Sequence, residues 1–110
     1  MKIVSFGYRR GLPLGDMDRI FDCRVMRNPH NDPKLRDQSG LDGEVQGFVA
    51  QDPHCIPMRD LAVEAVKNGA QTIAFGCYGG RHRSVAMAEL VADQLRGRNL
   101  DVEVEHRDLE

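Results

Sequence analysis

The sequence predicts an α/β domain whose sheet has about four mostly parallel strands, flanked by about three helices. The main observation is an apolar run, Thr72–Cys77, followed by an amphipathic segment, Ser84–Arg96, and an alternating segment, Leu100–His106. A strand, a helix and a second strand in this order are typical of a right-handed βαβ crossover. The length of 110 residues suits one core, so we expect a single domain over residues 1–110.

The N-terminal part begins with two shorter strands that are separated by a glycine-rich loop. Lys2–Phe6 and Ile20–Met26 are rich in the β-branched and aromatic residues that favour strands. The polar segment 28–33 follows, with two prolines and no hydrophobic period. A long polar loop in so small a domain is usually functional or mobile.

Two helices are expected between the polar segment and the apolar strand. Ser39 and Asp42 have the spacing of a capping box, which predicts that a helix begins at this point. Asp52-Pro53 opens the next helix, and Asn68-Gly69 ends it. The apolar face of this second helix is predicted to contain Met58, Leu61, Ala62 and Ala65.

The C-terminal part is the most regular. A continuous apolar run such as Thr72–Cys77 is typical of a central strand that is covered on both faces. Gly97 is expected to end the following helix in the position after its C-cap. Leu100–His106 alternates apolar and acidic residues, which indicates a strand with one solvated face at the edge of the sheet.

Composition excludes several classes of protein. The chain has 15 basic and 17 acidic residues and a net charge of −2, so its bulk charge does not favour nucleic-acid binding. Cys23, Cys55 and Cys77 form no Cys-x-x-Cys pair, and their odd number argues against a disulfide framework. No apolar run approaches the roughly 18 residues of a membrane span, and the N-terminus lacks the apolar stretch of a signal peptide. We therefore expect a cytoplasmic protein with no membrane partner.

Common metal and nucleotide motifs are missing from the sequence. His54 and Cys55 are adjacent, and the other His and Cys residues are scattered without zinc-site spacing. Neither G-x-x-x-x-G-K-[ST] nor G-x-G-x-x-G occurs. We expect neither a metal nor a cofactor.

The loop between the apolar strand and the third helix carries the expected chemistry. It lies at the carboxyl end of a strand, where α/β folds bind ligands. Its two glycines allow a ligand to approach the backbone, its amides and the helix start favour an anion, and its cationic side chains can grip phosphate oxygens. The predicted phosphate-binding residues are Tyr78, Gly79, Gly80, Arg81, His82, Arg83 and Ser84.

The same loop contains Cys-x5-Arg-Ser, the spacing of cysteine-dependent phosphatases, with Cys77 as nucleophile and Arg83 on the phosphate oxygens. The alternative is that Cys77 is simply the buried last residue of its strand. A phosphatase also needs a general acid, for which Asp22 and Asp108 are the candidates. The residues alone leave binding and catalysis both open.

Three residues outside the loop are further candidates. Asp22 either faces solvent or accepts hydrogen bonds from ligand hydroxyls, and His30 is either a surface residue or a donor to the ligand. Arg9 follows the first strand and either closes over the ligand or is solvated. An RNA-binding module is the third hypothesis, with one basic face made of Arg9, Arg10, Arg24, Arg27, Arg81 and Arg83.

Several motifs resemble the C-terminal domain family of the RNase adapter proteins RapZ and their YvcJ-type relatives. The resemblance rests first on Gly76–Ser84 and His106–Glu110. Further motifs follow in the family's order: Ser5-Phe-Gly7, Gly11-x-Pro13, Phe21-Asp-x-Arg24, Asn28-Pro-His30, Pro33-x-Leu-Arg36 and Ser39-Gly-Leu-Asp42.

The resemblance implies an α/β domain that binds glucosamine-6-phosphate and contributes to the binding of small regulatory RNAs. It puts the phosphate on Gly79, Gly80, His82 and Arg83, the sugar beside Asp22 and His30, and a basic residue at Arg9. We therefore expect a non-catalytic sensor domain for an amino-sugar phosphate, with RNA and a homo-oligomer as open possibilities. Tyr78 departs from the family, which commonly has Thr there. The family's N-terminal ATPase domain is also missing, so we expect a stand-alone relative without nucleotide hydrolysis.

Overall fold

Four parallel strands form one sheet in the order β2-β3-β1-β4 in the computed structural model, which describes residues 1–109. The strands are β1 (Lys2–Gly7), β2 (Arg19–Asp22), β3 (Thr72–Cys77) and β4 (Glu103–His106). Gly7 pairs with Cys77, and Asp22 pairs with Gly76, so the carboxyl ends of β1, β2 and β3 meet at one edge. The predicted sheet of about four mostly parallel strands is confirmed.

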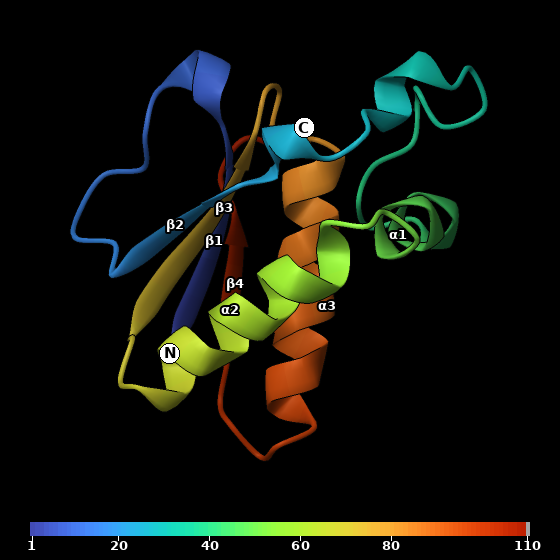
Figure 1. Cartoon of the computed structure of the whole chain (residues 1–110). Coiled ribbons are helices and arrows are strands. Elements are labelled where there is room, and N and C mark those ends of the chain that lie inside the picture. The colour runs from blue at the N-terminus through green and yellow to red at the C-terminus, as the bar shows by residue number, and fades with distance from the viewer. Residues whose placement is uncertain (110) are drawn as a thin grey trace.

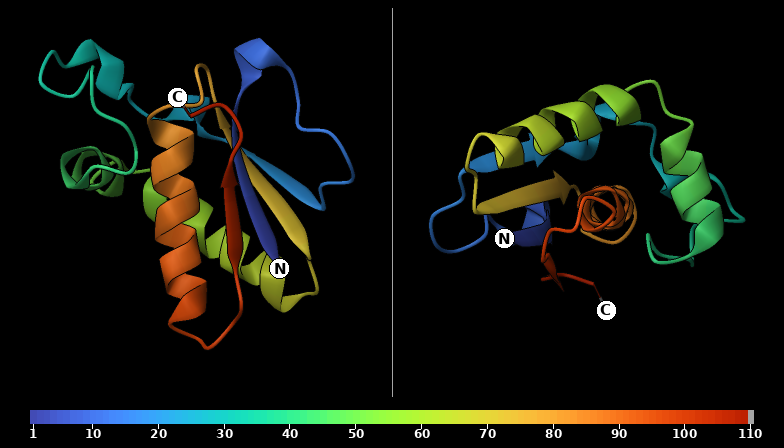
Figure 2. Two further views of the ribbon diagram at one scale, coloured as in Figure 1. Left: turned by 180° about the vertical axis from the view of Figure 1, so that it is seen from behind. Right: turned by 90° about the horizontal axis from the view of Figure 1, so that it is seen from below.

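Within residues 1–109, three α-helices accompany the sheet: α1 (Gly43–Ala50), α2 (Cys55–Lys67) and α3 (Arg83–Arg96). Figures 1 and 2 show α2 and α3 lying against the strands, with α1 beside α3 and farther from the sheet. The described part of the chain also has three short 3-10 helices in its connecting segments: η1 (Tyr8–Arg10), η2 (Cys23–Val25) and η3 (Pro29–Asn31). The α/β class with about three α-helices is therefore confirmed.

The two faces of the sheet are buried by different parts of the chain. Ile3, Ile73 and Phe75 point into the main core with the apolar faces of α2 and α3. The opposite face carries a smaller cluster of Val4, Phe6 and Ala74, against which Tyr8 and Met17 of the β1–β2 connection pack. The central strand β3 is thus covered on both faces, as its apolar run predicts. Strand β4 forms an edge of the sheet and exposes Glu103 and Glu105, as its alternation predicts.

Strand β2 is shorter than the predicted range Ile20–Met26. It ends at Asp22, whose carboxylate accepts a hydrogen bond from the Arg24 amide and caps the 3-10 helix η2. A short side chain that bonds its own backbone in this way competes with the strand ladder. The apolar residues Cys23 and Met26 are nevertheless buried, which explains why the segment has the composition of a strand.

Both predicted helix starts are too early. The Asp42 carboxylate accepts from the Ser39 amide, but this contact closes a turn, and α1 begins only at Gly43. Asp52 is buried and accepts from the amides of Arg27 and His54, so it ties two segments together and α2 begins at Cys55. Leu61, predicted on the apolar face of α2, is largely exposed.

The third helix and the last strand also differ at their ends. Gly97 has a right-handed φ of −62°, and the left-handed conformation falls on Asn99, with φ 65°. Strand β4 begins at Glu103 rather than Leu100. Glu110, the last residue of the C-terminal motif, lies outside the described residues. No helix in residues 1–109 has both the length and the apolar character needed to cross a bilayer.

Candidate functional site

The loop that follows β3 folds back over the end of β1. A Cβ atom on Gly7 would come within 2.5 Å of the Gly79 carbonyl carbon, so a side chain does not fit there. Gly80 has a φ of +77°, a conformation that L side chains rarely adopt. These two glycines let the β3–α3 loop lie directly on the carboxyl edge of the sheet. The Gly79 and His82 amides donate no hydrogen bond to any acceptor within residues 1–109.

A cavity of about 430 Å³ opens at this edge. The β3–α3 loop forms one wall, and η1 and the start of η3 form the others. The lining residues are Arg9, Asn28, His30, Cys77, Tyr78, Gly79, Arg81, His82 and Arg83. Eight of these nine are residues named from the sequence as ligand-binding or nucleophilic candidates. Asn28 was not among the predicted site residues, although its place in the Asn-Pro-His motif was a usable signal.

Arg83 is the most buried cation on the cavity wall, with 6% of its surface exposed. One of its terminal nitrogens, Nη1, donates to the Met26 carbonyl at 3.0 Å. Its Nε is buried and has no hydrogen-bond partner within the described residues. A buried donor without an acceptor is rare in proteins and is costly for a charged group. Arg83 is also the first residue of α3, so the positive end of that helix lies at the cavity.

Arg81 and His82 use their side chains to hold the neighbouring segment of the chain. The Arg81 guanidinium donates to the carbonyls of Asp37 and Gln38, at 2.6 and 2.9 Å. His82 Nε2 lies 3.2 Å from the carbonyls of Leu35 and Arg36. Because carbonyl oxygens only accept, this nitrogen carries the ring proton. Burial lowers the pKa of His82, so the ring is neutral near pH 7.

Gly80 and Ser84 do not line the cavity and contact the Cys77 sulfur instead. The Gly80 amide donates to Cys77 Sγ at 3.3 Å, and Ser84 Oγ lies 3.1 Å from the same sulfur. Ser84 is fully buried. The predicted loop residues thus separate into a set on the cavity wall and a pair behind it.

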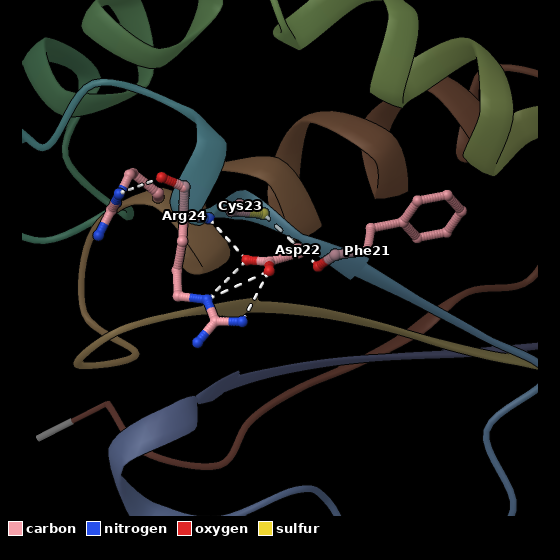
Figure 3. Close-up of polar contacts among 5 residues, drawn as sticks. Phe21, Asp22, Cys23 and Arg24 are labelled. Carbon is pink, nitrogen blue, oxygen red and sulfur yellow. Dashed lines mark hydrogen bonds and ion pairs between the residues drawn. The ribbon is translucent and has the colours of Figure 1, made fainter.

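Asp22 also lies off the cavity wall, in an ion pair with Arg24 (Figure 3). Arg24 Nε and Nη2 donate to the two carboxylate oxygens at 2.9 and 2.8 Å. These hydrogen bonds lower the pKa of Asp22. The Arg24 guanidinium stacks over the Tyr8 ring at 3.7 Å. A ligand hydroxyl would reach Asp22 only by displacing part of this pair.

The second candidate general acid, Asp108, has a structural position. Its Oδ2 accepts from the Gly7 amide at 2.7 Å and pairs with Arg107 at the same distance. Hydrogen bonds from Arg107 lower its pKa, which keeps the carboxyl ionised near neutral pH. Neither Asp108 nor Asp22 lines the cavity. Neither carboxyl is therefore positioned to protonate a leaving group held there.

The six arginines proposed for one basic face have different surroundings. Arg9, Arg81 and Arg83 line the cavity. Arg24 pairs with Asp22, and Arg27 packs over the Phe48 ring at 4.8 Å. Arg10 follows Arg9 in η1 but is not among the lining residues. Arg9, Arg81 and Arg83 thus share one cavity wall, whereas Arg24 and Arg27 have partners outside it.

The fold and the cavity define a small α/β domain with an arginine-lined cavity at the carboxyl edge of a parallel sheet. Comparison with known proteins names the family: the sequence model of the RapZ C-terminal domain matches residues 1–110, and the chain belongs to this family.

The most similar relatives include larger proteins. A "Nucleotide-binding protein" of Jannaschia sp. (strain CCS1) is 44% identical over all of this chain, which covers 37% of that protein. A nucleotide-binding protein of Thermus thermophilus is also 44% identical, with 43% of its length covered. The RNase adapter protein RapZ of Escherichia coli O1:K1 / APEC is 40% identical, with 42% of its length covered. The chain thus spans about two fifths of the length of these relatives.

Proposed function

We propose that this domain binds a phosphorylated amino sugar of the glucosamine-6-phosphate type and acts as a sensor rather than an enzyme. The observation that carries the proposal is Arg83, a buried guanidinium on the cavity wall whose Nε has no partner within the described residues. A phosphate oxygen would supply the missing acceptor once the Arg83 side chain turns Nε, which is closed to solvent, toward the cavity. A charge-assisted hydrogen bond of this kind contributes about 1.5–3 kcal/mol.

Other features of the same wall favour an anion. The Gly79 amide donates to no acceptor within residues 1–109, and the positive end of α3 begins at Arg83. Backbone amides at a helix start bind phosphate through direct hydrogen bonds and through the helix dipole. The His82 ring is neutral, and its Nε2 donates to the carbonyls of Leu35 and Arg36. His82 therefore offers the anion its backbone amide and not its ring.

The remaining wall suits the sugar. Asn28 and His30 provide polar groups, Arg9 lies at the first loop, and Tyr78 presents an exposed ring. A volume of about 430 Å³ falls in the range of small-molecule sites. The sequence-based prediction that Asp22 contacts the sugar requires that Arg24 release one carboxylate oxygen.

Family membership supports a regulatory role. Relatives that carry the printed name RNase adapter protein contain this domain as about two fifths of their length. Asp22 and Asp108, the two candidates for the general acid of a phosphatase, lie off the cavity wall and have lowered pKa values. We therefore favour binding without turnover.

Calorimetric titration with glucosamine-6-phosphate, glucosamine and inorganic phosphate tests the proposal. We expect binding of the phosphosugar, weaker binding of phosphate and none of glucosamine. Arg83→Ala should weaken binding at least about tenfold. Arg24→Ala removes an arginine outside the cavity and is the matched control, with affinity close to wild type. Because Arg83 also holds the Met26 carbonyl, the fold of the variant is checked by circular dichroism.

A second variant covers the case in which Arg83→Ala does not fold. Arg9 is exposed and lines the cavity, whereas its neighbour Arg10 does not line it. Arg9→Ala should weaken phosphosugar binding several-fold more than Arg10→Ala. Equal affinity of the wild type, Arg83→Ala and Arg9→Ala for glucosamine-6-phosphate would refute the site.

RNA is a second candidate ligand, because the relatives named RNase adapters share this domain. The cavity arginines could contact a backbone phosphate as well as a sugar phosphate. A gel shift with a structured RNA at two salt concentrations separates the two ligands. RNA binding predicts a steep loss of affinity with salt. The phosphosugar proposal predicts that Arg83→Ala weakens phosphosugar binding at least about tenfold, whether or not the wild type shifts RNA in the gel.

A further inference from the structure

The three cysteines are equally hidden but have different surroundings. Cys23, Cys77 and Cys55 expose 0%, 3% and 5% of their surface, so exposure alone does not distinguish them. Cys23 Sγ faces the Phe21 carbonyl and the Met58 sulfur, and burial raises its pKa well above the ordinary value. Burial also raises the pKa of Cys55. Both thiols are therefore protonated and poorly reactive near neutral pH.

Cys77 Sγ is surrounded by hydrogen-bond donors. The Gly80 amide donates to it at 3.3 Å, and Ser84 Oγ, 3.1 Å away, can donate as well. The start of α3 lies immediately beyond, and helix starts stabilise thiolates. Within the described residues, Cys77 is the cysteine whose sulfur accepts a backbone amide hydrogen bond, whereas the Cys23 sulfur faces a carbonyl and a thioether.

Cys77 lines this cavity, Cys55 lines a second cavity of about 420 Å³ between the helices, and Cys23 lines neither. Access through a cavity therefore does not distinguish Cys77 from Cys55, whereas the hydrogen-bond donors around its sulfur do. Independently, Arg83 on the same wall is a buried cation whose Nε has no partner within the described residues, and a cation at a cavity favours an anion or an electron-rich oxygen as the occupant.

We propose that Cys77 is a modification site, a selectively reactive thiol that a small peroxide oxidises to sulfenic acid. The thiolate attacks one oxygen of hydrogen peroxide and forms a sulfur–oxygen bond while the oxygen–oxygen bond breaks. Sulfur is oxidised by two electrons, and the departing hydroxide is reduced and takes up the thiol proton as water. The balance is one thiol and one peroxide to one sulfenic acid and one water. Because Cys77 is part of the cavity wall, the added oxygen should alter that wall and weaken anion binding there.

The test uses the reduced full chain and hydrogen peroxide, with dimedone to trap sulfenic acid and peptide mass spectrometry to locate it. We expect Cys77 to be labelled at least about tenfold faster than Cys23 or Cys55. Ser84→Ala should slow labelling of Cys77 several-fold, because it removes one donor to the sulfur. Cys55→Ala, the matched control, should leave the Cys77 rate unchanged.

Labelling of Cys55 or Cys23 first, or equal labelling of all three, overturns the proposal. Since this measurement on the wild type needs no variant, a variant that misfolds leaves the test intact. The inference shares the cavity with the proposed phosphosugar site but does not depend on that ligand. Selective labelling of Cys77 together with no calorimetric binding of glucosamine-6-phosphate would support the reactive thiol and refute the phosphosugar. Protection of Cys77 by the phosphosugar would support both.

Discussion

Two polar segments follow neighbouring parallel strands at the same edge of the sheet, and they neutralise their charges differently. After β2, Asp22 and Arg24 pair with each other through three hydrogen bonds between their side chains. After β3, none of the described residues places a carboxylate on the cavity wall beside the cationic side chains. Arg81 and His82 contact backbone carbonyls, and Arg83 keeps one buried nitrogen without a partner.

The difference indicates that the two segments at the carboxyl ends of β2 and β3 have different roles, one stabilising the fold and the other binding a ligand. A charged side chain that is paired with an opposite charge is largely neutralised, so it attracts a ligand only weakly. A buried cation whose partners are neutral carbonyls keeps its net charge and still attracts an anion. The 22–24 segment is therefore expected to support the edge, and the 77–83 segment to bind. The following predictions test this division, beginning with the largest effect.

The two adjacent glycines of the β3–α3 loop should respond very differently to alanine. Gly80 has a left-handed φ, and a Cβ there would come within 2.7 Å of the Gly7 nitrogen. Gly80→Ala should lower the free energy of unfolding by at least about 2 kcal/mol. A Cβ on Gly79 would meet nothing within 4 Å, so Gly79→Ala should change the free energy of unfolding by less than about 0.5 kcal/mol. Urea denaturation measures the free energy of unfolding of both variants. Equal effects would mean that Gly80 does not pack closely against Gly7 of β1.

Two arginines on the two segments give the next comparison. Arg81 donates two hydrogen bonds to carbonyls of the 37–38 segment, so Arg81→Ala should cost about 1–2 kcal/mol of stability. Arg24 forms an exposed ion pair with Asp22, and exposed pairs contribute little. Arg24→Ala should therefore cost less than Arg81→Ala in the same denaturation experiment. The reverse order would show that the 22–24 segment, not the 77–83 loop, is the stabilising one.

The segments also differ in how much of them the sequence could predict. The apolar run Thr72–Cys77 and the helix after it were placed within one residue, because burial on both faces and helical periodicity are strong signals. The length of β2 was overestimated because the Asp22 carboxylate accepts a hydrogen bond from the nearby Arg24 amide, a contact that composition does not reveal. The loop motif predicted the residues on the cavity wall. It could not predict that Arg81 and His82 bind carbonyls 43 to 47 residues away.

The pH dependence of stability distinguishes the two segments through His82. Burial lowers the folded-state pKa of His82 below its ordinary value of 6.5. As pH falls below that value, the unfolded chain takes up a proton that the folded chain does not, so stability decreases. His82→Gln keeps a donor for the 35–36 carbonyls and should show a weaker decrease between pH 7.5 and 5.5. Thermal unfolding of both proteins across this range measures the difference, which should be smaller than the effect of Arg81→Ala.

The smallest effect is expected at Asp22. Its carboxylate is occupied by Arg24 and lies off the cavity wall, so Asp22→Asn should leave the affinity for glucosamine-6-phosphate within about threefold of wild type.

If the sugar instead displaces Arg24 and takes a carboxylate oxygen, the loss of that charge should weaken binding tenfold or more. Calorimetric titration of Asp22→Asn beside Arg24→Ala separates these outcomes. Displacement predicts that Arg24→Ala tightens binding, because it frees the carboxylate, while Asp22→Asn weakens it. Small changes in affinity for both variants would mean that Asp22 and Arg24 stay paired in the complex as they are in the free domain.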